Sequence, residues 1–465
     1  MRERLQQYLS SLVSSPAAGF AAFAGLAGFA LAAYAPQIFR DGDSWWHLAA
    51  GQWMLAHGVL HTDPFSMGGG RWQAQEWLAE IIMAVSYRAA GWTGLHLLFG
   101  LAMGTTAAIL GFALRRRMEA VPALLALVIG LGLVTGSLLA RPHMLALPLL
   151  ALWTAMLVRA RTQSEAPNWW LLLVMPIWAN LHGSFLFGPA LAGALTVETI
   201  LSPASRSATP RWALFTLMSL AVCLLTPEML EGVLFPIRLL FMPGIAGIGE
   251  WQPSDVTHLN PLVLALAASL FVFVRVRVPV FRGLLFLGLV YLALAHARHQ
   301  MILGVAGPLL LSPYMGAAWP ARPLRPSPWP ARAAAFLFAV MLLARLASPT
   351  ARGEDRVTPA AALAHVPQEM RGRPVLNAYD YGGYLIFEGV RVFIDGRTDI
   401  YGTDYLKNYD ALAAGDTNAL SQTLAQHNIA WTIFPDGSPT VAALDKMPGW
   451  HRAYGDANAV VHFRD

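Results

Sequence analysis

The chain has little charge and almost no cysteine. Only 13% of its 465 residues are charged, whereas a soluble globular domain carries about 25%. Together with a hydrophobic content of 56%, this scarcity excludes an ordinary soluble enzyme and indicates a protein that crosses a membrane several times. The single cysteine, Cys223, lies inside an apolar run, so no disulfide framework is possible. The net charge of +5 requires no nucleic-acid partner, because the arginines fall in short loops between apolar runs.

Apolar stretches of membrane-spanning length recur before residue 350. A transmembrane helix needs about 20 apolar residues, and the hydropathy pattern predicts about eleven such helices. We therefore expect a polytopic α-helical membrane domain over residues 1–350, followed by a small α/β domain over 351–465. The predicted spans lie near 20–38, 92–114, 120–139, 144–158, 169–181, 184–200, 212–226, 260–274, 283–297, 300–317 and 333–349.

Arginine-rich connections alternate with arginine-poor ones along the chain. By the positive-inside rule the arginine-rich connections are cytoplasmic, and they include the N-terminus. An odd number of spans then places the C-terminal domain on the outer face, which in a bacterium is the periplasm. We expect a multi-pass protein of the bacterial inner membrane. The arginines concerned are Arg2, Arg4, Arg115, Arg116, Arg117, Arg159, Arg161, Arg206, Arg211, Arg275, Arg277, Arg282, Arg322, Arg325 and Arg332.

Unusual ionisable residues gather at the other, external set of loops. Such a group at the membrane boundary is costly unless it faces a water-filled cavity or takes part in chemistry. The break at His182-Gly183, between two short spans, either lines a cavity or forms a tight hairpin. Structural residues would be scattered over both faces, so the one-sidedness predicts a functional site at the outer face. Its candidate residues are Asp41, Asp43, His47, Glu76, Arg141, His143, His182, Glu250, Arg298 and His299.

The first external loop, residues 39–91, has the character of two helices that lie in the membrane interface. Segments 44–57 and 72–90 each place tryptophans and alanines on one face and carry few charges. Between them Asp63 precedes Pro64, a pair that is typical of a turn. The loop is therefore expected to follow the membrane surface.

Each candidate residue also has a purely structural interpretation. Asp43 or Ser44 could cap the helix that begins at Trp45, and His47, one turn later, could pair with Asp43. Glu76 could be an ordinary interfacial carboxylate. Arginines at helix ends can snorkel to the interface, and buried histidines can make only structural hydrogen bonds.

Three short segments, 43–48 (DSWWHL), 63–66 (DPFS) and 76–77 (EW), resemble segments of known membrane enzymes. With acidic residues after the first span, two interfacial helices, about eleven spans and a final soluble domain, the chain resembles uncharacterised bacterial members of the GT-C superfamily of membrane glycosyltransferases. The resemblance implies an enzyme that takes a sugar from a polyprenyl-phosphate carrier. It also implies transfer, with inversion, to a glycan, lipid or protein acceptor at the outer face.

One departure from the family pattern concerns the acidic pair. Some subfamilies have two adjacent acidic residues, whereas Gly42 separates Asp41 from Asp43 in this chain. Either carboxylate could therefore be the base. No motif typical of oligosaccharyl transfer to asparagine occurs in the C-terminal domain.

Sugar transfer from a phosphate carrier to a hydroxyl needs a base and a charge that stabilises the departing phosphate. Asp43, with Asp41 as its rival and Glu76 as a third candidate, can take the acceptor proton. Repulsion between neighbouring carboxylates raises the pKa of one of them, which suits a base. Arginine suits bidentate phosphate contacts. We expect the substrates to be bound by His47, Arg141, His143, His182, Glu250, Arg298 and His299.

A divalent metal is an alternative source of positive charge. Asp41 and Asp43, with His47 and Glu76, could hold Mg²⁺ or Mn²⁺, because these ions prefer oxygen ligands. The spacing matches no recognised metal motif. The resemblance does not decide the matter, since some relatives use a metal and others do not.

The C-terminal region has the composition of a soluble domain and holds the only lysines, Lys407 and Lys446. Short apolar runs that alternate with helical patterns predict a small α/β fold. The expected strand-like runs are 374–377, 381–387, 391–395, 431–434 and 459–463, and the expected helices are 402–414 and 417–427.

Two polar features of this domain have competing interpretations. Gly382-Gly383 is expected to be a turn and not a phosphate loop, because the lysine and the following helix of such a loop are absent. The segment 395–399 either contacts an acceptor or forms an internal salt bridge. We expect the domain to help bind or position the acceptor.

Three other functions compete with glycosyl transfer. A transporter or flippase of lipid-linked glycans would place polar groups through the membrane depth, often in repeated halves, and no internal repeat is visible. A polymerase or ligase of surface polysaccharide would share the carrier and the membrane face. A non-catalytic scaffold would leave the acidic loop around Asp41 and Asp43 unexplained.

Overall fold

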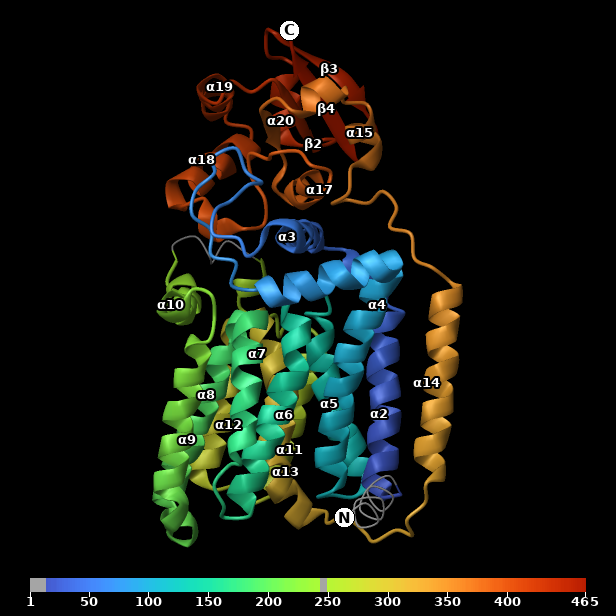
Figure 1. The fold of residues 1–465 in the computed structure, drawn as a ribbon, viewed down its shortest axis with the longest axis vertical. Coiled ribbons are helices and arrows are strands. Elements are labelled where there is room, and N and C mark those ends of the chain that lie inside the picture. The colour runs from blue at the N-terminus through green and yellow to red at the C-terminus, as the bar shows by residue number, and fades with distance from the viewer. Residues whose placement is uncertain (1–13, 243–248) are drawn as a thin grey trace.

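The computed structural model describes residues 14–242 and 249–465 of the chain. Arg2 and Arg4, two of the predicted cytoplasmic arginines, lie outside the described residues. The chain is mostly helical, at 67%, and its helices form a bundle that carries a small sheet-containing domain at one end (Figure 1). An apolar helical part followed by a C-terminal α/β part is what the sequence predicts.

Each predicted apolar stretch forms a helix. Helices suit a bilayer because the backbone there has no water to satisfy its hydrogen bonds. The helices of the bundle are α2 (Pro16–Ala33), α4 (Trp77–Arg115), α5 (Ala120–Thr135), α6 (His143–Thr162), α7 (Val174–Leu181), α8 (Phe187–Leu201), α9 (Thr209–Ala221), α11 (Pro261–Arg275), α12 (Val280–Ala295), α13 (Gln300–Ala318) and α14 (Trp329–Ala347).

Seven helical segments of the described chain are long and apolar enough to cross a membrane. Four further apolar helices have 10–17 residues. At 1.5 Å per residue these are shorter than the hydrocarbon core of about 30 Å. The length and composition of the helices are therefore those of a helical membrane protein, and about eleven crossings stays a prediction. The seven are Pro16–Ala33, Trp77–Arg115, His143–Thr162, Gly183–Leu201, Pro203–Leu224, Ala297–Ala318 and Trp329–Ala347.

Helix α4 changes direction at Gly91. Ala90 and Gly91 have non-helical backbone angles, and the φ of Gly91 is +57°. Glycine adopts this left-handed conformation without the steric cost that a side chain brings. The part before the kink lies across the end of the bundle, and the part after it runs down the bundle (Figure 1). The predicted interfacial helix and the span that follows it are thus two arms of one bent element.

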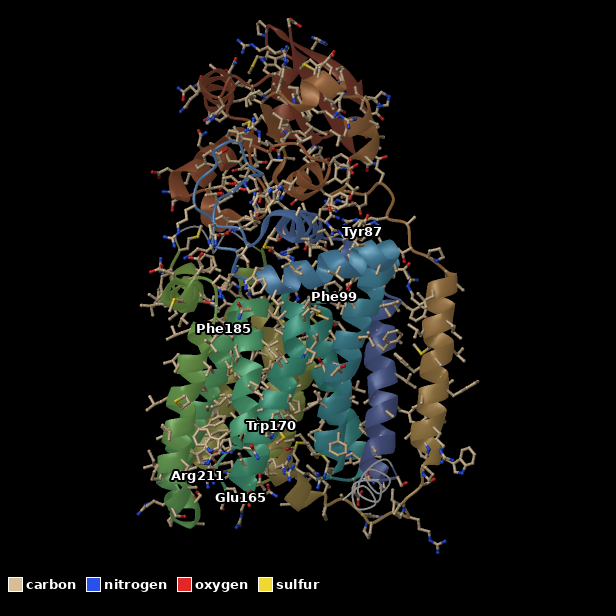
Figure 2. All side chains as sticks on the ribbon, viewed as in Figure 1. Tyr87, Phe99, Glu165, Trp170, Phe185 and Arg211 are labelled. Atoms are coloured by element: carbon tan, nitrogen blue, oxygen red, sulfur yellow. The ribbon has the colours of Figure 1, made fainter. Side chains whose placement is uncertain are left out.

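The two ends of the bundle differ in chemistry. Arg211 and Glu165 lie at the end away from the C-terminal domain, whereas Tyr87 lies next to that domain (Figure 2). At the far end Arg117 donates to Thr162 at 3.4 Å, and Met118 pairs with Pro320 in a backbone bridge. Loops that are arginine-rich in sequence therefore meet at the far end.

The C-terminal domain is built on a four-stranded sheet of order β1-β2-β4-β3. β1 pairs with β2 in parallel, and the other neighbouring pairs are antiparallel. The expected helices and the strands β1, β2 and β4 are confirmed. β3 was not expected, because its exposed sequence WHRAYG lacks an apolar alternation. The elements are β1 (Val375–Asn377), α17 (Gly382–Phe387), α18 (Thr403–Ala413), α19 (Thr417–Gln426), β2 (Trp431–Pro435), α20 (Pro439–Leu444), β3 (Trp450–Gly455) and β4 (Ala459–Arg464).

The prediction of a strand-like run at 381–387 and of a turn at Gly382-Gly383 is wrong. This segment is helix α17, which packs on helix α3 (Asp43–His57). A Cβ on Gly383 would lie 2.2 Å from the carbonyl oxygen of Gly42. Gly383 therefore allows the helix to approach the first external loop closely, a contact between segments that are distant in sequence.

The predicted strand at 391–395 is also absent from the sheet. The Asn377 side chain takes the place of a neighbouring strand, because its Oδ1 accepts the backbone N–H of Phe393 at 2.9 Å and its Nδ2 donates to the carbonyl of Ile394 at 2.8 Å. The backbone of Val392 pairs instead with Phe65 and Met67 of the first external loop. The run is extended, but its partner comes from the membrane domain.

Candidate functional site

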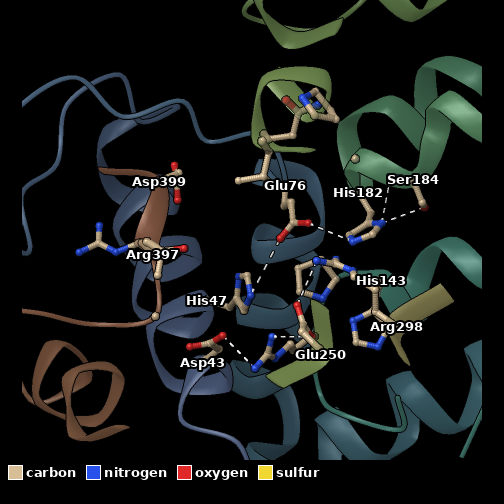
Figure 3. Close-up of a pocket in the computed structure, with 18 of the residues that line it drawn as sticks. Asp43, His47, Glu76, His143, His182, Ser184, Glu250, Arg298, Arg397 and Asp399 are labelled. Carbon is tan, nitrogen blue, oxygen red and sulfur yellow. Dashed lines mark hydrogen bonds and ion pairs between the residues drawn. The ribbon is translucent and has the colours of Figure 1, made fainter. Parts of the chain in front are cut away.

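A cavity of about 520 Å³ lies where the end of the bundle, the first external loop and the C-terminal domain meet. Its walls include Asp41, Gly42, the start of α3, the residues just before α4, the turns that precede α6 and α8, the segment at Glu250 and the start of α13 (Figure 3). The structure brings together every residue that the sequence predicted for the site. These are Asp41, Asp43, His47, Glu76, Arg141, His143, His182, Glu250, Arg298 and His299.

Arg141 holds the two aspartates of the first external loop. Its Nε and Nη2 donate to the two carboxylate oxygens of Asp41, the latter at 2.6 Å. Nη2 also lies 2.9 Å from Oδ2 of Asp43. Asp43 begins helix α3, but Gly42 is the N-cap and no side chain caps this end. The capping interpretation of Asp43 is therefore wrong, and its carboxylate, 19% exposed, faces the cavity.

The two aspartates differ in acidity although they share one arginine. Burial raises the pKa of both carboxyls. For Asp41 the charge and hydrogen bonds of Arg141 outweigh burial and hold the pKa below its ordinary value. For Asp43 burial dominates, and the neighbouring carboxylates Asp41 and Glu250 add to it, so its pKa rises to about 7. Asp41 is thus the permanent counter-charge of Arg141, and Asp43 exchanges a proton near neutral pH.

Glu76 lies between two histidines. Its Oε2 is 4.0 Å from Nε2 of His47, and its Oε1 is 3.5 Å from Nε2 of His182. The other ring nitrogen of His47 lies 3.0 Å from Glu80 of helix α4. The expected pairing of His47 with Asp43 is therefore not formed. The backbone N–H of Ser184 donates to Nδ1 of His182 at 3.1 Å, which leaves the ring proton on Nε2, facing Glu76.

Burial sets the protonation of this group. It raises the pKa of Glu76 to about 8, helped by the negative charges of Asp399 and Glu250. It lowers the pKa of His47 and of His182 well below the ordinary value, and nearby positive charge acts in the same direction. The histidines are therefore neutral, and Glu76 holds its proton at neutral pH.

Glu250 links the two arginines of the bundle end. Its Oε1 lies 3.0 Å from Nη1 of Arg298, and its Oε2 lies 3.5 Å from Nη1 of Arg141. The guanidinium of Arg298 stacks on the ring of Trp251 at 4.4 Å. Burial raises the pKa of Glu250, but the two arginines outweigh it and hold the value below normal. Both arginines are thus ion-paired in the cavity. They do not extend away from it to the membrane interface, as the snorkelling interpretation would require.

Two of the predicted histidines have structural contacts. Nε2 of His143 donates to the carbonyl of Ser137 at 2.7 Å. His299 packs between the rings of Phe187 and Trp251, with ring centroids 6.0 and 6.1 Å apart. Both line the cavity, and a substrate role for either stays a prediction.

The C-terminal domain adds residues of the segment 395–399 to the cavity wall, although the sequence analysis did not count them among the site candidates. Arg397 is 1% exposed and donates to Asp63 at 2.7 Å and to Asp395 at 2.7 and 2.9 Å. It also stacks on Trp72 at 4.7 Å. This arginine fixes the segment that carries Asp399, which lines the cavity. The segment 395–399 therefore forms the internal salt bridge and also lines the cavity, and its contact with an acceptor stays a prediction.

Gly396 brings the backbone of this domain against the candidate base. A Cβ on Gly396 would lie 1.8 Å from Oδ1 of Asp43. Only a residue without a side chain allows this approach. The sequence signal for this contact is the polar run 395–399, which follows an apolar run. The sequence around Gly396 does not show that its partner is Asp43.

Metal binding has no prepared geometry in the described part of the chain. No group of three His, Cys, Asp or Glu side chains converges there as a metal site. Asp41 and Asp43, the metal candidates, converge on the Arg141 guanidinium. A cation site at this pair would require the arginine to move.

Comparison with known proteins gives no assignment. No protein-family model matches the chain, and no curated protein matches its sequence. The function is therefore argued from the cavity.

Proposed function

We propose that the protein is a membrane glycosyltransferase that moves a sugar from a polyprenyl-phosphate carrier to an acceptor hydroxyl. The observation that carries the proposal is Asp43, a buried carboxylate with a pKa of about 7, in one cavity with Arg141 and Arg298. The resemblance to the GT-C superfamily supports the same chemistry. The cavity lies at the end of the apolar helices, where a lipid-anchored phosphate is within reach.

The residues divide the reaction between them. The acceptor oxygen attacks the anomeric carbon, its proton passes to the carboxylate of Asp43, and the bond between that carbon and the phosphate oxygen breaks with its electron pair on the phosphate. A single displacement of this kind inverts the anomeric centre. Asp41 keeps Arg141 in place, which makes Asp41 a positioning residue and Asp43 the base.

Phosphate binding falls chiefly to Arg298. Arg141 is shared among Asp41, Asp43 and Glu250, whereas Arg298 makes one ion pair, through Nη1, with Glu250. A guanidinium has five N–H donors, so Arg298 can keep this pair and still bind an oxyanion. His182 Nε2, which carries the ring proton, can add a hydrogen bond.

The proposal includes a location. With the arginine-rich end in the cytoplasm, the cavity and the C-terminal domain face the periplasm of a bacterial inner membrane. This placement suits a carrier whose lipid chain lies in the bilayer and whose sugar is presented at the outer face. A polysaccharide polymerase or ligase would use the same face and carrier.

The test uses the purified full-length protein in lipid nanodiscs with a panel of radiolabelled polyprenyl-phosphate sugars. Release of the sugar and its transfer to added acceptors are measured separately, with and without a chelator. We expect Asp43→Asn to lower transfer by about a hundredfold or more, and Asp41→Asn to weaken donor binding through Arg141. The matched control is Asp410→Asn, which changes an exposed aspartate of α18.

Each outcome decides a part of the proposal. Transfer that survives in Asp43→Asn at normal expression would remove Asp43 as the base. Loss of activity with chelator would assign a role to Mg²⁺ or Mn²⁺. If no donor of the panel is hydrolysed or transferred, the glycosyltransferase proposal fails, and translocation of a fluorescent lipid-linked sugar in proteoliposomes then tests the transporter.

A further inference from the structure

The arginines that line the cavity are all matched by carboxylates. Arg141 pairs with Asp41 and Asp43, and Arg298 pairs with Glu250. The third, Arg397, is enclosed by Asp63 and Asp395. Each arginine of the described cavity wall therefore already has at least one carboxylate partner.

Four other carboxylates of the described cavity wall have no such partner: Glu76, Glu80, Asp399 and, beside Gly42, Asp380. Among the described residues, no arginine or lysine lies within 4.0 Å of the carboxylate of Glu76, Glu80 or Asp399. Among the described residues, the ionisable partners within 4.0 Å of Glu76 and Glu80 are His47 and His182. Because burial lowers the pKa of both histidines well below normal, these rings are neutral and add no counter-charge. Glu76, whose pKa burial raises to about 8, therefore keeps its proton at neutral pH until a cation beside it lowers that pKa.

A second observation points to a ligand at these carboxylates. Oε2 of Glu80 has no hydrogen-bond partner among the described residues, although the side chain is 2% exposed and lines the cavity. A buried acceptor without a donor is costly. A ligand that brings several N–H donors and a positive charge would satisfy it together with Glu76 and Asp399.

Asp399 lies where such a ligand could arrive from water. It lines the cavity and also a second hollow of about 450 Å³, whose charged residues are Arg71, Glu231, Arg238 and Asp399 itself. Figure 3 shows Asp399 beside Arg397, with Glu76 on the other side of the space between them. Because Arg397 is locked by Asp63 and Asp395, the position of Asp399 is held as well.

We infer that Glu76, Glu80 and Asp399 bind the protonated amino group of an amine-bearing sugar, carried by either the donor or the acceptor. That the amine belongs to a sugar rests on the proposed function. An ammonium group donates three hydrogen bonds and needs no convergent metal geometry. The tryptophans Trp46 and Trp72, which also line the cavity, suit the faces of a sugar ring and of a cation.

The first test measures binding without any reaction. Saturation-transfer NMR on the full-length protein in nanodiscs compares methyl glucosaminide, which is cationic at pH 7, with methyl N-acetylglucosaminide, which is neutral. We expect the cationic probe to bind about tenfold more tightly, the gain of one charge-assisted contact. Asp399→Asn is expected to remove the preference, and Asp410→Asn is expected to keep it.

A second variant, Asp399→Lys, controls for the possibility that Asp399→Asn loses binding because it misfolds. Asp399→Lys places an ammonium group of the chain itself at the wall, so it should remove the preference without lowering the melting temperature. Equal binding of the two probes, no binding of either, or an unchanged preference in both folded Asp399 variants would overturn the inference.

Activity measurements then locate the amine and separate the two proposals. If Asp399→Asn raises the KM for hydrolysis of amino-sugar donors alone, the donor carries the amine. If it affects only transfer to amine-bearing acceptors, the acceptor carries it. A preference for the cationic probe without any transfer would leave this inference standing and the glycosyltransferase proposal refuted, and transfer without the preference would do the reverse.

Discussion

At the residue scale, the cavity shows how one chain gives different properties to similar side chains. Asp41 and Asp43 are two residues apart, yet the pKa of Asp41 is lowered by the Arg141 contacts and that of Asp43 rises to about 7 through burial. The bidentate contact with Arg141 goes to Asp41. A permanent anion and a proton acceptor therefore lie side by side, which is the division of roles that a base near neutral pH requires.

Glu76→Gln is expected to change how stability depends on pH. Burial raises the pKa of Glu76 from 4.5 to about 8, so between these values the folded protein holds a proton that the unfolded chain releases. The contribution is present below pH 4.5 and is lost as pH rises through about 8. Glutamine stays neutral, so we expect the melting temperature to rise by a few degrees at pH 8.5 and little at pH 5.

Differential scanning fluorimetry in detergent measures this effect. The control is Glu388→Gln, which changes an exposed carboxylate at the end of α17. An equal change of melting temperature at both pH values would contradict the prediction.

At the element scale, two local features position the cavity. The kink at Gly91 turns α4 from the bundle end into the bundle, which keeps Glu76 and Glu80 beside α3. The segment 395–399 enters from the other side, fixed by Arg397. Neither element forms the site alone, because residues of both line the cavity together with those of other helices.

Gly396→Ala tests the contact between these elements. The added methyl group would overlap the carboxylate of Asp43, so we expect at least a tenfold loss of transfer and a lower melting temperature. Overpacking of this kind costs about 1–3 kcal/mol. Gly372→Ala is the control, because a Cβ there meets nothing within 4 Å. Unchanged transfer and melting temperature in Gly396→Ala would show that the contact does not hold Asp43.

At the scale of the whole molecule, the C-terminal domain is joined to the membrane domain by buried contacts. Asp63 and Arg397, both 1% exposed, form an ion pair across 334 residues of sequence. Arg352, in the segment between α14 and the domain, stacks on Trp45 of α3 at 4.5 Å. The domain is therefore a wall of the cavity.

Arg397→Met is expected to weaken the contact between the C-terminal domain and the membrane domain. It leaves Asp63 and Asp395 buried without a counter-charge, a loss of about 3–5 kcal/mol. Arg452→Met, which removes the 43% exposed partner of Asp445, is the control and should cost less than about 1 kcal/mol. Denaturant unfolding measures both, and limited trypsin digestion should cut at Arg352 only in Arg397→Met. Similar stability losses in the two variants would contradict the prediction.

The orientation is tested with reporter fusions. The positive-inside rule predicts that alkaline phosphatase fused after Asp465 is active, and that the same reporter fused after Arg117 is inactive. A green fluorescent protein fused at the same sites should show the opposite pattern. Activity at both sites or at neither would refute the predicted arrangement of the two faces.

The sequence alone predicted the apolar membrane-length helices, the two helices of the first external loop and ten residues that line the cavity. Hydropathy and charge act locally, so a run of apolar residues or a loop of arginines shows its environment without knowledge of the fold. The same reasoning found every candidate from Asp41 to His299, because ionisable groups at one membrane face are rare enough to stand out.

The tertiary structure decided which carboxylates are paired and which are left for a ligand. His47 pairs with Glu80 and not with Asp43. Gly382-Gly383 begins a helix that packs on α3, and Gly383 has no Cβ that would collide with the carbonyl of Gly42. Asp399 lines the cavity because the ion pairs of Arg397 with Asp63 and Asp395 hold its segment in place. These choices depend on contacts between residues far apart in the chain, and burial and pairing, which set charge and pKa, arise only when those contacts form.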